Sequence, residues 1–194
     1  MTKKILVMAL LAIGGFANAQ KGTILVGGNI SYSSEKTEYQ FSEEKVNSFT
    51  FSPKVGYQFH DNWTVGGEFA VTSATNDDGA VEEKLNGFKI GAFVRYTMPL
   101  SQTFSVFADM GVGVQNQKYK EYGPGNAFYK SKADGVYAGV TPALFINMKK
   151  GFGLNFSIGG LGFETLSYDN NGADVSNFYF NFGQTFNIGI SKNF

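Results

Sequence analysis

The stretch that decides the fold of this chain is its last, Asn177–Phe194, which reads NFYFNFGQTFNIGISKNF. Its even-numbered positions are mostly Phe and Ile, whereas its odd-numbered positions are mostly Asn, Gly, Ser and Thr. A period of two is typical of a β-strand, because successive side chains point to opposite sides of the pleated backbone. A free edge strand this apolar would invite aggregation, but a closed barrel has no edge and can turn such a face to lipid. The stretch therefore predicts the closing strand of a membrane-spanning β-barrel.

Seven earlier segments show the same period and complete the predicted barrel. The expected strands are residues 23–33, 48–59, 63–72, 88–98, 104–115, 135–148, 152–163 and 177–194. Each is long enough for a tilted strand to cross a bilayer, which takes about 9–11 residues. An even number of strands is also what single-chain bacterial barrels have. The predicted fold class is all-β, an eight-stranded antiparallel up-and-down transmembrane β-barrel.

Two kinds of connection alternate along the chain. Short polar turns follow the second, fourth and sixth strands, for example at His60–Asn62. Long polar segments, expected to be loops, occupy residues 34–47, 73–86, 116–134 and 164–176. Bacterial barrels have short periplasmic turns and long outer loops. We therefore expect both termini in the periplasm and four loops outside the cell.

The amino terminus has the pattern of a secretory signal. Two lysines precede the short apolar run Ile5–Phe16, and Ala17 and Ala19 are the small residues that a signal peptidase reads, with cleavage before Gln20. The run is too short to cross about 30 Å of hydrocarbon as a helix. We expect residues 1–19 to be a signal peptide and residues 20–194 to be the barrel domain.

Composition excludes several classes of function. The 194 residues include 16 basic and 16 acidic side chains, so there is no strong charge excess to favour nucleic acid. There is no Cys, which excludes disulfides and cysteine-ligated metal. Aromatic residues make up 16% although mean hydropathy is slightly negative at −0.13. That combination is natural for a barrel with an apolar outside and a polar inside.

Four pieces of sequence resemble a known family. They are SPKVGY at 52–57, GAFVRY at 91–96, FADMGVG at 107–113 and IGISKNF at 188–194. The chain resembles the outer-membrane β-barrel family of Bacteroidetes-type bacteria and is similar to small eight-stranded barrels of the OmpX and OmpW kinds. The resemblance implies a location in the outer membrane. It also implies outer-membrane lipids and the barrel-assembly machinery as partners.

The carboxyl terminus resembles the assembly signal of such barrels. The residues concerned are Ile188, Ile190 and the terminal Phe194. One position departs from the usual pattern, because Lys192 stands where an aromatic residue is common. Lys192 falls in the outward register near the periplasmic end, where its long side chain can reach lipid headgroups.

Five charged residues fall in the inward register of the predicted strands. They are Lys54, Glu68, Lys89, Arg95 and Asp109. If the first turn centres on Asp61, Lys54 and Glu68 lie opposite each other, a stabilising arrangement. The lumen of an eight-stranded barrel is just wide enough for side chains to fill. We favour a hydrogen-bonded plug over the alternative, a narrow path for ions or protons.

The sequence does not indicate catalysis or a cofactor. The single histidine, His60, lies beside Asp61 in an expected turn, and there is no Gly-x-Ser-x-Gly elbow. The segments Asp77–Gly79 and Asp169–Asp174 contain oxygen ligands that could suit Ca²⁺, but Asp, Asn and Gly are also ordinary turn residues. We interpret both as turns and expect neither a metal site nor an enzyme.

Three functions remain open from the sequence. The first is an integral outer-membrane barrel, monomeric, with a filled lumen and a structural or envelope-associated role. The second is the binding or passage of a small apolar solute, as in OmpW-like barrels. The third is a secreted, soluble, lipocalin-like binder, which would place apolar side chains inside rather than outside. Aromatic residues in the third long segment, among them Tyr119 and Tyr129, suggest an adhesive or ligand-binding patch.

Overall fold

The computed structural model describes residues 22–38, 43–169, 172–183 and 187–194. It contains ten strands and a short 3₁₀ turn. They are β1 Ile24–Glu38, β2 Glu43–His60, β3 Trp63–Asp77, β4 Glu82–Pro99, β5 Phe104–Tyr122, η2 Pro124–Asn126, β6 Phe128–Lys149, β7 Phe152–Ser157, β8 Leu161–Tyr168, β9 Asp174–Phe180 and β10 Asn187–Asn193. The predicted cleavage residues Ala17, Ala19 and Gln20 lie outside the described residues. No helix in the described part of the chain is long and apolar enough to span a membrane.

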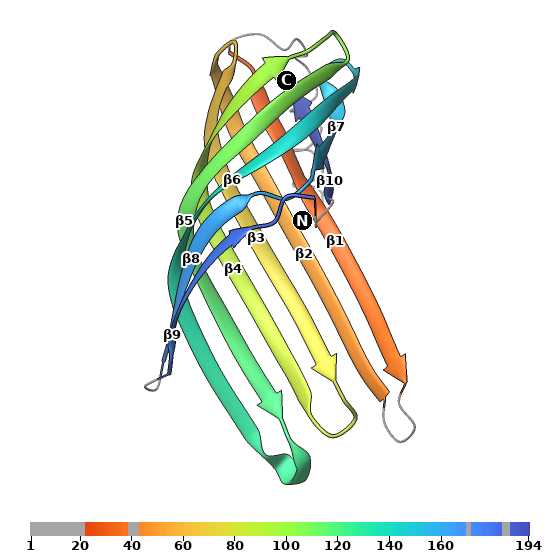
Figure 1. Ribbon diagram of the computed structural model, residues 1–194, viewed down its shortest axis with the longest axis vertical. Helices are drawn as coiled ribbons and strands as arrows, with labels where there is room; N and C mark the ends of the chain where they lie inside the picture. The colour runs from red at the N-terminus through yellow and green to blue at the C-terminus, as the bar shows by residue number, and fades with distance from the viewer. Residues whose placement is uncertain (1–21, 39–42, 170–171, 184–186) are drawn as a thin grey trace, which may run out of the picture.

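The strands form a tall antiparallel barrel (Figure 1). Strands β1 to β6 each pair with the next along the chain, β6 pairs with β7, β7 with β10, and β10 with β1. This ring contains eight strands, so the prediction of an eight-stranded antiparallel barrel is confirmed. Strands β8 and β9 continue beyond the ring, along the other half of β6.

The two last expected strands are each divided in two, which the sequence did not predict. The first break, at Ile158–Gly160, separates β7 from β8, and the second, after Phe180, separates β9 from β10. The breaks face each other: Asn181 N–H donates to Gly160 O at 3.0 Å, and Gly183 N–H to Ile158 O at 2.7 Å. Gly159 (φ 103°) and Gly183 (φ 78°) have positive φ, which glycine adopts without steric cost. At this level of the barrel, hydrogen bonds between the two breaks thus take the place of the regular strand ladder.

The two mid-strand prolines lie beside interruptions in the ladder. Pro53 pairs with β1, but the ladder from β2 to β3 skips Ser52 and Pro53. Pro142 pairs with β5, but β6 passes from its β8 partners to its β7 partners across Thr141 and Pro142. Because proline has no N–H to donate, each of these two prolines lies where its strand stops pairing with one of its two neighbouring strands. Pro142 therefore coincides with the break between β7 and β8.

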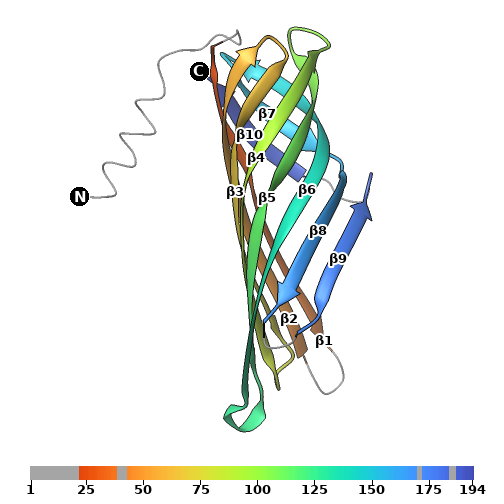
Figure 2. The ribbon, with the colours of Figure 1, turned by 90° about the vertical axis from the view of Figure 1, so that its left-hand side faces the viewer.

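The seam between the first and last strands is closed along only part of its length. Strand β10 pairs with β1 from Leu25 to Asn29. In the described residues, no backbone pairing joins the rest of β1, from Ile30 onward, to β9. Figure 2 shows β8 and β9 as a pair of strands standing to one side. The ring is thus continuous near the chain termini and laterally open in its other half.

The expectation of long outer loops is wrong. Most residues of the polar segments 34–47, 73–86 and 116–134 extend the strands into tall two-stranded hairpins, and β8 and β9 take in much of 164–176. In the register, Lys36 pairs with Lys45 and Lys118 with Lys132. Outside a bilayer both faces of a hairpin meet water, so polar residues on both faces hide the alternation that marks a strand.

The two ends of the barrel differ. The turn end has the connections at Asp61–Asn62, 100–103 and Lys150–Gly151, together with the described termini Gly22 and Phe194. Lys150 (φ 50°) and Gly151 (φ 73°) form a two-residue hairpin turn with positive φ at both positions. The hairpin end has the extended hairpins. Both ends of the described chain thus lie at the end with short turns.

Apolar side chains face outward and polar ones inward. On the outside, Ile30 is 67% exposed and Phe178 68% exposed. Inside, Arg95, Asp109 and Gln115 are buried, and Phe93, at 1% exposed, is the largest fully buried side chain among the described residues. A soluble lipocalin-like barrel needs the opposite arrangement. The third functional alternative is therefore wrong, because this outside surface requires lipid.

Candidate functional site: a charge layer across the lumen

An arginine–aspartate pair faces the lumen from β4 and β5, in the part of these two strands nearer the turn end. Arg95 and Asp109 face each other directly in the register of these two strands. Arg95 Nε donates to Asp109 Oδ1 at 2.5 Å and Nη2 to Oδ2 at 2.9 Å, a two-point contact that fixes both side chains. Their side chains are only 8% and 9% exposed. The pair is therefore a buried, bidentate ion pair.

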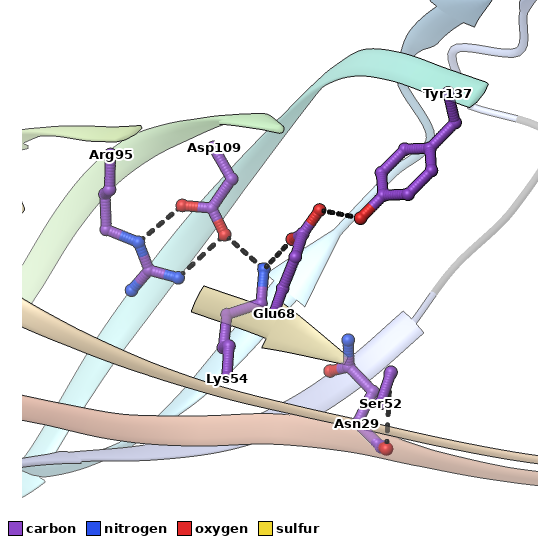
Figure 3. Close-up of polar contacts among 7 residues, drawn as sticks. All are labelled: Asn29, Ser52, Lys54, Glu68, Arg95, Asp109 and Tyr137. Carbon is purple, nitrogen blue, oxygen red and sulfur yellow. Dashed lines mark hydrogen bonds and ion pairs between the residues drawn. The ribbon is translucent and has the colours of Figure 1, made fainter. Parts of the chain in front are cut away.

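A second pair from the first hairpin joins it. Lys54 on β2 and Glu68 on β3 are register partners, with Nζ 3.6 Å from Oε2. Lys54 Nζ also donates to Asp109 Oδ2 across the lumen at 2.7 Å. From β6, Tyr137 donates its hydroxyl to Glu68 Oε1 at 2.8 Å. Figure 3 shows the resulting chain of contacts from Arg95 to Tyr137.

These five residues, here named the charge layer, come from five consecutive strands, β2 to β6. They are Lys54, Glu68, Arg95, Asp109 and Tyr137. Two cations and two anions make the layer neutral overall. Isolated buried charges are costly, but paired and hydrogen-bonded ones are tolerated. The layer can therefore fill the lumen without an unpaired charge.

Aromatic rings and glycines support the layer. The Arg95 guanidinium carbon lies 3.7 Å from the centre of the Phe107 ring, and Lys54 Nζ lies 5.0 Å from the centre of Phe93. A Cβ at Gly66 would meet the Phe93 ring at 2.8 Å, and one at Gly111 would meet Glu68 Oε1 at 2.5 Å. At Gly66 a Cβ would also come within 2.6 Å of Gly56 Cα, so backbone would have to move, and at Gly111 the Glu68 carboxylate would have to shift. The cations thus gain cation–π contacts in a space that the glycines provide.

A separate ion pair lies closer to the hairpin end. Lys89 on β4 donates to Glu164 Oε2 on β8 at 3.0 Å, and its ammonium lies 5.4 Å from the centre of the Tyr137 ring. Their side chains are 39% and 26% exposed. Of the five residues expected as one cluster, the structure brings four together and gives Lys89 a different partner. Glu164 was assigned to a loop, so the sequence did not indicate this pair.

Cavities lie on both sides of the charge layer. Arg95 and Phe107 line a cavity of about 220 Å³ at the turn end. Lys54, Glu68 and Tyr137 line two smaller cavities, of about 200 and 90 Å³, towards the hairpin end. No residue lines both the turn-end cavity and either of the others. The charge layer thus lies between the turn-end cavity and the two cavities towards the hairpin end.

The other candidate residues serve local structure. His60 pairs with Trp63 across the first turn, where the ladder shifts register. Asp78 accepts the backbone N–H groups of Ala80 and Val81 at 2.9 and 2.7 Å. These N–H groups hold the pKa of its carboxyl below the usual range, because they favour the charged form. No group of acidic or histidine side chains suited to a metal ion occurs among the described residues.

The second Asp-rich segment also serves a turn. Asp169 accepts the Ser131 hydroxyl at 3.1 Å and the Lys132 N–H at 2.9 Å, which ties this turn to β6. The N–H of Lys132 contributes most to lowering the pKa of its carboxyl. Carboxylate oxygens of Asp78 and Asp169 thus accept hydrogen bonds from backbone N–H groups, as the interpretation of these segments as turns requires.

The proposed assembly signal lies on the outer face of the closing strand. Ile188 and Ile190 are 53% and 56% exposed, opposite Phe156 and Leu154 of β7. Phe194 follows β10 and exchanges backbone hydrogen bonds with Ile24, at 2.9 and 3.1 Å. Lys192 places its ammonium 4.3 Å from the centre of the Phe194 ring. The residues thus form one outward strip, and their role in assembly stays a prediction.

A closed antiparallel barrel with an apolar outside and a filled polar inside defines a small membrane-spanning β-barrel protein. The sequence matches the family model described as the outer membrane protein beta-barrel domain over residues 5–190. The chain belongs to this family. The expectation of an outer-membrane barrel is therefore confirmed, while a Bacteroidetes origin stays a prediction.

Solved structures similar to the chain are also outer-membrane barrels. Ail, the attachment invasion locus protein of Yersinia pestis, is 18% identical, with 90% of this chain and 100% of Ail covered and a TM-score of 0.53. Ail in complex with the heparin analogue sucrose octasulfate is 17% identical, with the same coverage and a TM-score of 0.52. The translocator domain of the autotransporter NalP from Neisseria meningitidis is 12% identical, with 91% of this chain and 66% of that chain covered and a TM-score of 0.49. At these identities the likeness shows the fold alone. No curated protein matches the sequence.

Proposed function

We propose that the protein is a non-conducting, non-enzymatic, monomeric envelope barrel that holds its extended hairpins outside the cell. The observation that carries this proposal is the charge layer. Side chains from β2 to β6 meet across the lumen, and the Arg95–Asp109 pair at its centre is less than a tenth exposed. A barrel filled in this way offers its outer surface, rather than a channel, for function.

Conductance measurements test the filled lumen. We expect the refolded protein in planar bilayers to show no stepwise current. The Glu68→Ala variant should also stay closed, because Arg95, Lys54 and Asp109 keep their mutual contacts. Stepwise current through the unaltered protein would refute the proposal. Current through Glu68→Ala alone would assign the barrier to Glu68 rather than to the whole layer.

We also propose that the termini are periplasmic and the hairpins external. The support is the difference between the short-turn end and the hairpin end, since bacterial barrels place short turns in the periplasm. The chain has no Cys, so single cysteines introduced at exposed positions are unique labels. Ala127→Cys in the β5–β6 hairpin should react with an impermeant maleimide on intact cells. The matched turn-end variant Gln102→Cys should react only after the outer membrane is opened, and the reverse pattern would invert the orientation.

A second candidate function is passage of a small apolar molecule through the side of the barrel. The observation that favours it is the seam, where the structure describes no pairing between β9 and β1 beyond Asn29. A long bismaleimide cross-link between Tyr32→Cys on β1 and Phe178→Cys on β9 would obstruct this opening. If vesicles containing the protein take up an apolar dye, closing the seam should abolish the uptake. Unchanged uptake would exclude a lateral route.

A further inference from the structure

Four lysines form a compact group on the outer face of the β5–β6 hairpin. Lys118 lies opposite Lys132, and Lys120 lies opposite Lys130 in the next position of the same face. Positions two residues apart along a strand are about 7 Å apart, and neighbouring strands about 5 Å. Lys118, Lys130 and Lys132 are exposed and Lys120 is half-buried. We call these four residues the lysine ladder.

The lysine ladder carries four cations beside a single acid, Asp134, in the next row of the same face. Like charges directly opposite on paired strands are destabilising. Within the described residues, none of the four lysines forms an ion pair within 4 Å. The acid beside the ladder on the same face is Asp134, which accepts a hydrogen bond from Asn116 Nδ2 at 2.7 Å. Asp169 accepts the backbone N–H of Lys132 rather than its ammonium. The ladder is therefore a surface that attracts an external anion.

Other lysines at the hairpin end are neutralised, which makes the ladder distinctive. Lys36 and Lys45 also lie opposite each other, but Glu43 lies 2.9 Å from Lys36 and 2.5 Å from Lys45, and Glu38 lies 2.7 Å from Lys36. Lys84, beside Lys120 on β4, has Glu82 at 2.9 Å. The same level of the barrel thus carries paired charges on β1, β2 and β4 and unpaired ones on β5 and β6.

Two other nearby acids, Glu83 of β4 and Glu121 of β5, lie on the opposite face. Glu83 and Glu121 both accept the Tyr119 hydroxyl, at 2.7 and 3.3 Å. Tyr119 alternates with Lys118 and Lys120, so its side chain points to the inner face. These carboxylates cannot reach the ladder across the sheet. The outer face of the hairpin therefore keeps an excess of positive charge, with four lysines against Asp134.

The ladder continues the lipid-facing surface. Below it on the same face, Val114 of β5 lies opposite Val136 of β6, and they are 54% and 50% exposed. One pair of polar residues, Asn116 on β5 and Asp134 on β6, separates this apolar belt from the ladder. Beyond the ladder, Tyr122 and Phe128 form an outward pair with ring centres 5.2 Å apart. The order outward from the bilayer is thus apolar belt, lysines, aromatic pair.

We propose that the lysine ladder binds the phosphates of a phosphorylated glycolipid in the outer leaflet, with its sugar against Tyr122 and Phe128. The position next to the apolar belt is that of lipid headgroups, and basic clusters at this level attract anionic lipids. A phospholipid headgroup stops at the level of its phosphate. Only a headgroup that extends outward past the phosphate reaches the aromatic pair. In the cell this assignment rests on the proposed orientation with the hairpins outside.

Native mass spectrometry of the refolded protein in detergent tests the proposal. The probe, called lipid A below, is purified lipid A that retains its innermost core sugars, which extend outward past the phosphates. The ladder variant changes Lys118, Lys120, Lys130 and Lys132 to Gln. The matched control changes Lys36, Lys45, Lys149 and Lys150 to Gln, which removes the same charge elsewhere. Each basic residue near an anionic surface adds roughly five-fold to binding. We expect the ladder variant to bind lipid A at least about 20-fold more weakly and the control to stay within about two-fold of the unaltered protein.

Three outcomes would overturn the proposal. Equal binding by the ladder variant and the control would show that the ladder is not the site. Equal affinity for lipid A and phosphatidylglycerol would remove the glycolipid assignment. So would an unchanged affinity for lipid A in the double variant Tyr122→Ala with Phe128→Ala. Binding of a soluble sulfated polysaccharide without lipid A would assign the surface to a different ligand. The conductance and labelling experiments above do not involve the ladder, so their failure is distinguishable from these outcomes.

Discussion

Replacing Asp109 by Asn removes the central anion of the charge layer. Asp109 accepts hydrogen bonds from Arg95 at 2.5 and 2.9 Å and from Lys54 at 2.7 Å. The substitution keeps the shape but changes the layer from neutral to a charge of one positive unit. Glu68, 3.6 Å from Lys54, compensates only one of the two cations. Arg95 is left as a buried, uncompensated charge.

Breaking a buried ion pair by removing one partner costs about 3–5 kcal/mol. Because Lys54 is 18% exposed and keeps Glu68, we expect the lower part of this range, about 3 kcal/mol, for Asp109→Asn. Urea unfolding in lipid vesicles measures it, with the fluorescence of Trp63, the single tryptophan, as the signal. The control is Asp174→Asn on β9, an exposed position, which should change stability by less than about 0.5 kcal/mol.

A double variant separates charge from packing. In Arg95→Met with Asp109→Leu, both charges of the pair are gone and the Lys54–Glu68 pair remains. Apolar replacement of a buried pair is often neutral or stabilising. The double variant should therefore be more stable than Asp109→Asn. An Asp109→Asn variant as stable as the Asp174→Asn control would refute the argument, and a double variant less stable than the single one would show that packing, not charge, is lost.

Three further predictions concern other parts of the barrel. Tyr137→Phe removes the hydroxyl that donates to Glu68 and should lower the free energy of unfolding by about 1 kcal/mol in the same urea assay. The control is Tyr32→Phe, at an exposed position on β1, and an equal effect of the two substitutions would show that the hydrogen bond contributes nothing. Since the pKa of Asp78 is lowered in the folded turn, its contribution to stability is present above the unfolded pKa and lost as pH falls through the folded one. The amide NMR shifts of Ala80 and Val81 should therefore titrate together with a midpoint below the usual Asp value, and a midpoint at or above it would contradict the turn hydrogen bonds. Deletion of Phe194 should lower the yield of folded protein in outer-membrane fractions relative to Phe178→Ala, which removes an exposed ring on β9. Equal yields would show that Phe194 is not part of an assembly signal.

The faces of the strands could be predicted from the sequence, because a period of two assigns every side chain to one side. The same register, counted from the turn at Asp61, places Lys54 opposite Glu68 as the structure has them. The partners Tyr137 and Glu164 could not be predicted, since they lie 69 and 75 residues from Glu68 and Lys89 respectively. Contacts across a lumen depend on how strands stagger around the whole ring, which no local pattern specifies.

Strand lengths and breaks were the other part that the sequence left undetermined. The extensions at 116–122 and 128–134 carry polar residues on both faces, so the pattern contains no contrast between inside and outside. The kink at Gly159–Gly160 has a visible signal, because a glycine pair inside a strand often marks a bend. Its counterpart at Gly183 becomes meaningful only once the two breaks are known to face each other.

The half-open seam has a consequence for the membrane around the protein. From Ile30 onward, the free edge of β1 presents backbone N–H and C=O groups that no described strand satisfies. Hydrocarbon cannot satisfy such groups, and each one left without a partner there costs several kcal/mol. We therefore expect water and headgroups to descend along this edge, so that the bilayer is thinner beside β1 than beside β4 and β5. The protein would then deform its surroundings on one side only, which gives it a preferred orientation relative to neighbouring molecules in the plane of the membrane.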